Sequence, residues 1–228
     1  MNQKIKFYLK YKLMRYFPNL FHFISSVRFP KTAASKKNDI IIDGYMRSSN
    51  TFSYYAFKYL NKKASISHHR HSSAGILFGI RHNIPVLLLI RRPSDVFLST
   101  YIFKNQDISF NEIAESWLRF YEIFIPYKYK ICIGDFNSVT SDFSNIVQKI
   151  NFHYKKDFNY HTEENFNNLI FNNIQDWHND FHKQTLNDRI AVPNTKRLEK
   201  KLFFTNKMKN EIPDLLAKAD NLYKELIS

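Results

Sequence analysis

Apolar residues along this chain gather in short runs, and most runs are followed by a polar loop and a longer amphipathic stretch. The runs predict strands at 40–42, 64–67, 85–90 and 130–133. The amphipathic stretches predict helices at 52–60, 72–82, 93 onward, 111–125, 142–150 and 194–227. Strands that alternate with helices indicate an α/β fold with a mostly parallel central sheet flanked by helices.

Two segments stand apart from this alternation. Residues 1–26 combine aromatic and apolar side chains with lysines, which predicts a basic amphipathic helix or pair of helices. Such a segment either packs on the domain or lies on an anionic membrane surface. Residues 155–190 are rich in Asn, His and Phe and show no clear period, so we expect a long irregular segment beside the substrate.

Length and charge narrow the class of protein. A chain of 228 residues with 44% hydrophobic residues favours one domain, with residues 1–30 as a basic N-terminal extension. The formal net charge of +14 predicts an anionic partner, and nucleic acid, membrane, glycan or nucleotide would all fit.

The run 84–90 is too short to cross a bilayer, and lysines interrupt any apolar core of an N-terminal signal. Cys132, the only cysteine, fits a reducing compartment. We expect a cytoplasmic protein, with a peripheral contact on the inner face of a membrane as an open alternative.

The polar loop at 44–51 predicts a binding site for a phosphate or sulfate group. It follows a strand and precedes a helix, so backbone N–H groups and the helix dipole favour an anion there. Arg47 adds a positive charge, and Ser48, Asn50 and Thr51 add donors. A Walker A loop would need Gly at position 49 and Lys at position 50, and only Thr51 fits that pattern, which disfavours a nucleoside triphosphatase.

A second polar element follows the apolar run at 85–90. Arg91 lies just past the expected strand, and Ser99 follows eight residues later. A helix that starts near Pro93 would bring Ser99 back toward Arg91, where the two could hold one phosphate. A surface arginine with an unrelated helix serine is the plainer alternative.

These two elements together resemble the cofactor motifs of the sulfotransferases that use 3′-phosphoadenosine 5′-phosphosulfate (PAPS). Segment 44–52, GYMRSSNTF, is similar to the family's 5′-phosphosulfate loop, Y-P-[KR]-S-G-[TN]-T-[WF]. Segment 91–99, RRPSDVFLS, is similar to its 3′-phosphate motif, R-x-P-x-D-x-x-x-S. Segments 135–142 and 192–197 resemble weaker family features near the adenine and before the last helix. Met46 and Ser49 depart from the usual Pro and Gly.

The resemblance implies a role for each matching residue. Arg47 takes the place of the catalytic Lys or Arg beside the leaving oxygen, and Arg91 with Ser99 would bind the 3′-phosphate. The positions implied for the 5′-phosphate are Ser48, Ser49, Asn50 and Thr51. Phe52 would stack on adenine, Phe136 would lie near the base, and Arg197 would lie near the 3′-phosphate. No metal is implied for this reaction.

Three histidines lie between the two motifs. Family members that sulfate alcohols often use a histidine at the end of the second strand as general base. His71 is our first choice and His69, which we expect on the same strand face, is the second. His68 would point away and act structurally, and a metal site of His68, His69 and His71 is an alternative.

The expected activity is transfer of a sulfuryl group from PAPS to a hydroxyl or amine. The basic N-terminal segment suggests a surface polysaccharide or a lipid-linked glycan as acceptor. One alternative is a kinase-like phosphate-loop protein, which would need the Walker A lysine that this loop lacks. The other is a basic protein that binds membrane or nucleic acid, which would leave both nucleotide motifs unexplained.

Overall fold

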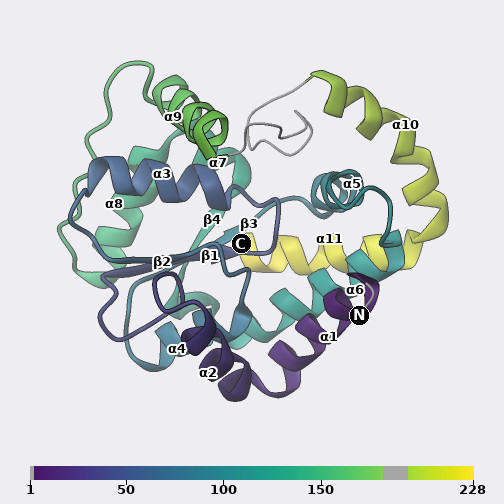
Figure 1. Cartoon of the computed structure of the whole chain (residues 1–228), viewed down its shortest axis with the longest axis horizontal. Helices are drawn as coiled ribbons and strands as arrows, with labels where there is room; N and C mark the ends of the chain where they lie inside the picture. The colour runs from purple at the N-terminus through teal and green to yellow at the C-terminus, as the bar shows by residue number, and fades with distance from the viewer. Residues whose placement is uncertain (1–2, 182–194) are drawn as a thin grey trace.

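The computed structural model describes residues 3–181 and 195–228, and it confirms the predicted α/β fold. Four parallel strands form one sheet in the order β2-β1-β3-β4 (Figure 1). The strands are β1 (Ile40–Gly44), β2 (Ile66–His68), β3 (Val86–Ile90) and β4 (Cys132–Asp135).

Side chains of the two central strands alternate between two hydrophobic clusters, one on each face of the sheet. In β1, Ile40 and Ile42 enter one cluster, whereas Ile41 enters the other. In β3, Leu87 and Leu89 likewise face away from Leu88. Both faces are buried, which explains why these strands read as continuous apolar runs.

Helices cover both faces of the sheet (Figure 1). One face carries α3 (Asn50–Leu60), α7 (Phe136–Ser141), α8 (Phe143–Tyr154) and α9 (Phe166–Phe181). The other carries α1 (Gln3–Tyr16), α4 (Ser73–Arg81), α5 (Pro93–Phe103), α6 (Phe110–Tyr121), α10 (Thr195–Glu211) and α11 (Pro213–Ile227). The remaining elements are α2 (Pro18–Arg28), packed on α4, and the 3₁₀ segment η1 (Glu122–Lys130).

Two expectations about helices need correction. The segment 155–190 is not irregular throughout, because α9 occupies Phe166–Phe181. Its buried residues Phe166, Ile170 and Ile174 recur every four positions, a helical period that the surrounding asparagines obscure. The expected helix 111–125 ends at Tyr121, and the chain continues as a 3₁₀ segment that contains Pro126, which lacks the N–H an α-helix requires.

The N-terminal segment forms two helices that meet at Pro18. Helix α1 buries Phe7, Tyr11 and Met14 in the cluster that also holds α6. The packed arrangement expected as one of two alternatives is therefore present. None of the helices within residues 3–181 and 195–228 is both long and apolar enough to span a membrane.

The chain order places both motif loops at one point of the sheet. From β1 the chain passes through α3 to β2, which lies on one side of β1, and then through α4 to β3 on the other side. The carboxyl ends of β1 and β3 therefore flank the position where strand order reverses, which is where α/β sheets bind ligands. Gly44 permits this close pairing, since a Cβ there would lie 2.2 Å from the carbonyl oxygen of Leu89.

Candidate functional site

The loop after β1 is fixed at both ends by buried polar contacts. The Tyr45 N–H donates to the hydroxyl of Tyr121 at 3.1 Å, and the Tyr45 hydroxyl lies 2.7 Å from the Ser116 Oγ. At the start of α3, the Asn50 Nδ2 donates to the Tyr45 carbonyl at 2.9 Å. The residues between them, including Arg47 and the buried Ser48, are held in a short, well-anchored turn.

Two residues of this turn adopt left-handed backbone geometry. The φ angle is 68° at Arg47 and 64° at Ser49. Ser49 occupies the position where the sulfotransferase loop usually has glycine, and glycine adopts this geometry without steric cost. Ser49 thus keeps the turn at some cost in strain, and its hydroxyl donates to the Ser48 carbonyl.

The turn leads directly into the N-terminus of α3, which is suited to an anion. Ser49 is the N-cap residue, but its side chain accepts no bond from the first turn. The first N–H groups of a helix have no partner inside the helix, and together they carry about half a positive charge. A phosphate or sulfate oxygen at this end would satisfy both the donors and the dipole.

Arginine side chains from the ends of β1 and β3 converge beside this helix. The Arg47 Nε donates to the Ser99 Oγ at 3.0 Å, and the Arg91 Nη1 donates to the Arg47 carbonyl at 3.3 Å. The Arg91 guanidinium also lies 3.7 Å from the centre of the Phe136 ring. Four of the residues singled out from sequence are therefore brought together: Arg47, Arg91, Ser99 and Phe136.

A third cation, Lys201 of α10, joins the arginine pair. Its Nζ lies 3.5 Å from the Asp95 Oδ1. The pKa of Lys201 is lowered, first by burial and then by the charges of Arg91 and Arg47. Sequence reasoning missed Lys201, since α10 lies about a hundred residues after the motif and lysines recur along it.

The histidine segment lies against the first loop, as expected, but not as an extended strand. Strand β2 ends at His68, and both His69 and His71 have positive φ angles, 55° and 47°. The expected sharing of a strand face is therefore wrong. From this bent segment, the His69 Nε2 contacts the start of α3, where it lies 3.0 Å from the Thr51 Oγ1.

His68 contacts both Tyr54 and His69, so the expectation that it points away from His69 is wrong. Its ring stacks on Tyr54 with ring centres 3.7 Å apart, and its Nδ1 lies 2.7 Å from the Nδ1 of His69. Burial lowers the pKa of His68 to about 3 and that of His69 to about 4. Both imidazoles are therefore neutral at pH 7.

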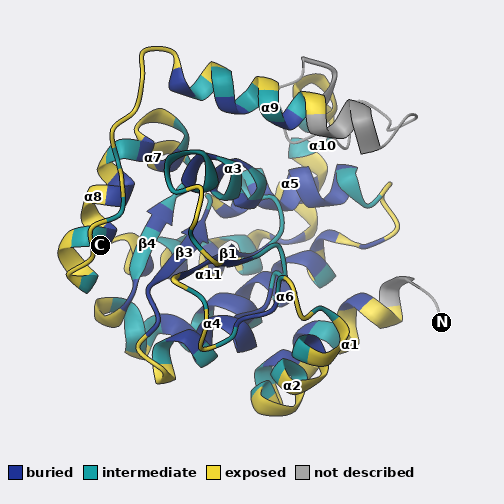
Figure 2. Cartoon of the chain, turned by 60° about the vertical axis from the view of Figure 1, so that its left-hand side comes forward, coloured by how far each residue is buried: buried dark blue, intermediate teal, exposed yellow. Residues whose placement is uncertain are grey.

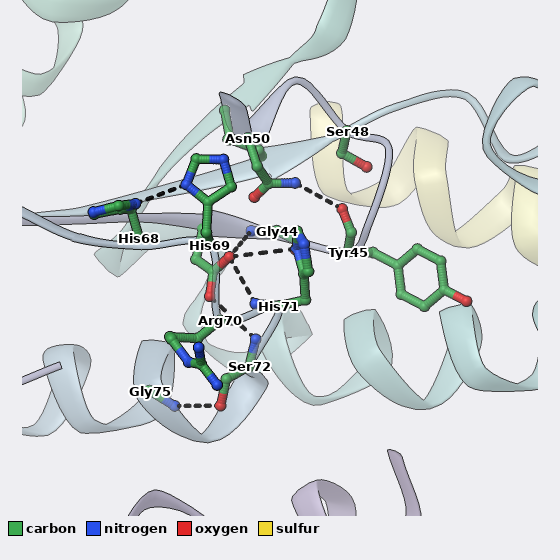
Figure 3. A network of polar contacts seen from close by, with 12 residues as sticks. Gly44, Tyr45, Ser48, Asn50, His68, His69, Arg70, His71, Ser72 and Gly75 are labelled. Atoms are coloured by element: carbon green, nitrogen blue, oxygen red, sulfur yellow. Dashed lines mark hydrogen bonds and ion pairs between the residues drawn. The ribbon is translucent and has the colours of Figure 1, made fainter. Parts of the chain in front are cut away.

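His71 is held with a defined tautomer (Figure 3). Its Nδ1 lies 3.0 Å from the Gly44 carbonyl oxygen. A carbonyl oxygen only accepts, so Nδ1 carries the proton and Nε2 carries the lone pair. The side chain is 24% exposed, and burial holds its pKa well below the ordinary value. A neutral imidazole with a free Nε2 lone pair is the form that a general base requires.

A buried carboxylate, Asp43 at the end of β1, holds the histidine segment in place. It accepts N–H bonds from Gly44 at 3.1 Å, His71 at 3.0 Å and Ser72 at 3.1 Å. Three such bonds lower a carboxyl pKa, yet burial outweighs them and raises the pKa of Asp43 to about 6. The sequence signal for this role is the position of an acidic residue directly after the apolar run 40–42, a position to which we gave no function from sequence.

The N-terminal helix also reaches this group through Lys10. Its Nζ donates to the Arg70 carbonyl at 3.2 Å. Burial lowers the pKa of Lys10 to about 8, while the charge of Asp43 opposes that shift. Lys10 thus connects α1 to the segment that carries His69 and His71.

One expected cofactor residue, Phe52, points away from this arrangement. Phe52 is 3% exposed, and its ring packs against Phe143 and Phe171 in the hydrophobic cluster, so the structure does not present it for stacking on adenine. Phe52 lies in the first turn of α3, on the face of the helix that packs on the sheet. The side chain of Arg197 lies outside the described part of the chain.

No protein-family model matches the chain, and no curated protein matches it closely enough to count as a relative. Within the described residues, no three His, Cys, Asp or Glu side chains group as a metal site would require. The site combines a helix N-terminus suited to an anion, two arginines from the ends of neighbouring strands, and a neutral histidine that contacts the end of β1.

Proposed function

We propose that this chain is a PAPS-dependent sulfotransferase. The observation that carries the proposal is the gathering of positive charge beside the N-terminus of α3. Arg91 donates at 3.3 Å to the backbone carbonyl of Arg47, the residue that follows the neighbouring strand, and the charges of both arginines act on Lys201. Three cationic side chains in one region favour a ligand with more than one anionic group.

The residues present fit the two anionic ends of such a nucleotide. The turn 45–49 and the first turn of α3 supply backbone donors and Arg47 for the 5′-phosphosulfate. Arg91, with Ser99 and Lys201 close by, supplies positive charge for the 3′-phosphate. The guanidinium of Arg91 is fixed against Phe136, which reduces the entropy lost when it binds an anion.

When bound, PAPS supplies a sulfuryl group whose S–O bond to the phosphate breaks as an acceptor oxygen or nitrogen bonds to sulfur. Arg47 and the N–H groups of the loop stabilise the charge that grows on the leaving phosphate oxygen. His71 accepts the acceptor's proton at Nε2, and Gly44 holds its Nδ1–H. Asp43 positions this histidine through the backbone N–H of His71.

The acceptor class stays an expectation drawn from charge. A basic protein of net charge +14 favours an anionic acceptor, such as a polysaccharide or a lipid-linked glycan. A kinase-like protein would need the lysine of a Walker A loop, and this loop has no lysine at that position.

Thermal unfolding with added nucleotides tests the proposal. The product 3′-phosphoadenosine 5′-phosphate (PAP) stabilises the fold by mass action, and its shift exceeds that of ATP with Mg²⁺ at equal concentration. An equal or larger shift with ATP would favour the kinase-like alternative. The control is Arg47→Ala, which we expect to reduce the PAP shift without lowering the melting temperature of the free protein by a similar amount.

A further inference from the structure

Helix α1 has two apolar faces on opposite sides, and only one of them is packed. Phe7, Tyr11 and Met14 are buried in the protein. Leu9 and Leu13 lie on the opposite side and are about 40% exposed. A helix that is apolar on both sides is ordinarily covered on both sides, yet residues 3–181 and 195–228, the part of the chain that the structure describes, leave the second face exposed.

Helix α2 extends this exposed face (Figure 2). Its exposed apolar residues recur three and four positions apart, which places them on one side of the helix. They are Leu20, Phe23, Ile24 and Val27, and their exposed fractions run from 50% to 69%. Tyr16 and Phe17, both more than half exposed, join the stripe of α1 to that of α2. We call the exposed apolar residues of α1 and α2, with Tyr16 and Phe17 between them, the N-terminal apolar face.

The segment that carries this face contributes charge of one sign. Residues 1–38 contain nine Lys and Arg and no Asp or Glu. Lys6 and Lys12 are exposed on either side of the Leu9–Leu13 stripe. A partner that covers the face must therefore accept apolar side chains at its centre and offer negative charge around them.

We propose that the N-terminal apolar face binds the surface of a bilayer that contains anionic lipids. Phe23, Leu20 and their neighbours enter the boundary between headgroups and acyl chains, and the flanking lysines contact the headgroups. A second copy of the chain fits less well, because it would bring the same excess of positive charge to the interface. The inference does not depend on the proposed sulfotransferase activity.

The structure changes how this proposal is tested. Deleting α1 would remove Phe7, Tyr11 and Met14 from the core, so point variants of exposed residues are needed instead. The full chain is sedimented with vesicles of phosphatidylglycerol and phosphatidylcholine, and with vesicles of phosphatidylcholine alone. We expect strong binding to the first, which falls as salt is raised, and weak binding to the second.

The apolar contribution is measured with Leu20→Ser combined with Phe23→Ser. The double variant is expected to bind anionic vesicles at least about tenfold more weakly, because two half-exposed apolar side chains no longer enter the bilayer. Phe152→Ser removes an aromatic ring that is 90% exposed on α8 and serves as the matched control. The control is expected to bind as the unaltered protein does.

The charge contribution is measured with Lys6→Gln combined with Lys12→Gln. Two charges close to an anionic surface predict a loss of about tenfold or more at low salt. Lys62→Gln combined with Lys63→Gln removes the same charge from the exposed turn between α3 and β2 and is expected to have a much smaller effect. Equal losses in both pairs would show non-specific attraction and overturn the proposal.

Two control measurements, melting temperature and PAP affinity, complete the test. Melting temperature and PAP affinity should be unchanged in every variant, since all the altered side chains are exposed. If the Leu20 and Phe23 variant is less stable, Ile24→Ser combined with Val27→Ser repeats the measurement on the same face. Vesicle binding that is unaffected by both apolar pairs, or vesicle-free dimerisation abolished by them, would overturn the membrane assignment.

Discussion

Replacing Arg91 by alanine should separate the two ends of the nucleotide. Arg91 and Arg92 are neighbours in sequence, but only Arg91 turns into the site, where it contacts Phe136 and the Arg47 carbonyl. Arg92 is exposed. The pair therefore offers a matched comparison, in which the same charge is removed from inside and outside the site.

The magnitude follows from the surroundings of Arg91. Its guanidinium is covered on one side by the Phe136 ring at 3.7 Å, so a phosphate that binds it is partly removed from water. Truncating one partner of such a charge pair costs about 2–4 kcal/mol. PAP affinity should therefore fall by about 30-fold to 1,000-fold in Arg91→Ala. Adenosine 5′-phosphosulfate lacks the 3′-phosphate and should lose much less.

Isothermal titration of both ligands into the unaltered protein, Arg91→Ala and Arg92→Ala provides the assay. We expect a large loss for PAP only in Arg91→Ala, and at most a small change for either ligand in Arg92→Ala. Equal losses for PAP and adenosine 5′-phosphosulfate would show that Arg91 does not bind the 3′-phosphate. Equal losses in the two variants would show that only overall charge matters.

Two further predictions concern the histidines. Replacing His71 by alanine should lower the transfer rate by about 10²–10⁴-fold with PAP affinity unchanged, whereas an active His71→Ala beside an inactive His69→Ala would transfer the role to His69. The free energy of unfolding should fall as pH drops from 6.5 toward 4, because His68 and His69 take up protons in the unfolded chain before they do so in the folded one. At 1.36 kcal/mol per pH unit, each imidazole lowers the free energy of unfolding by up to about 2 kcal/mol at pH 5. Protonation of Asp43, whose pKa is raised, restores about 1 kcal/mol of that free energy. Urea unfolding at pH 7 and pH 5 measures the net change in the free energy of unfolding. Greater stability at pH 5 than at pH 7 would contradict the prediction.

The sequence predicted the site residues that directly follow a strand, because the end of a strand can be located from the sequence alone. Arg47 and Arg91 each come just after an apolar run, and parallel strands bring their carboxyl ends to one edge. That reasoning placed both arginines and Ser99 in the same region. It could not show that Arg47, rather than Arg91, donates to Ser99, because side-chain direction depends on the left-handed turn at Arg47.

The parts that sequence missed depend on packing between distant segments. Lys10 and Lys201 reach the site from the two ends of the chain, and nothing in their local sequence distinguishes them from other lysines. Phe52 follows the motif, but its ring is drawn into the core by Phe143 and Phe171, which lie about 90 and 120 residues further along. Which face of a helix is buried is decided by these long-range partners.

The role of residues 1–26 likewise could not be decided without the structure. Sequence presented packing and membrane contact as competing explanations for residues 1–26. The structure shows that α1 packs through Phe7, Tyr11 and Met14 while its opposite side stays exposed. One helix can therefore serve both purposes, which a list of apolar positions does not reveal until the buried face is known.

Calorimetric titration of the unaltered protein with PAP tests the central claim most directly. The account predicts a single site that binds PAP at least about tenfold more tightly than adenosine 5′-phosphate, because only PAP places a second phosphate against Arg91. It also predicts that binding does not require Mg²⁺. Absence of binding, or equal affinity for the two nucleotides, would contradict the assignment of this site to PAPS.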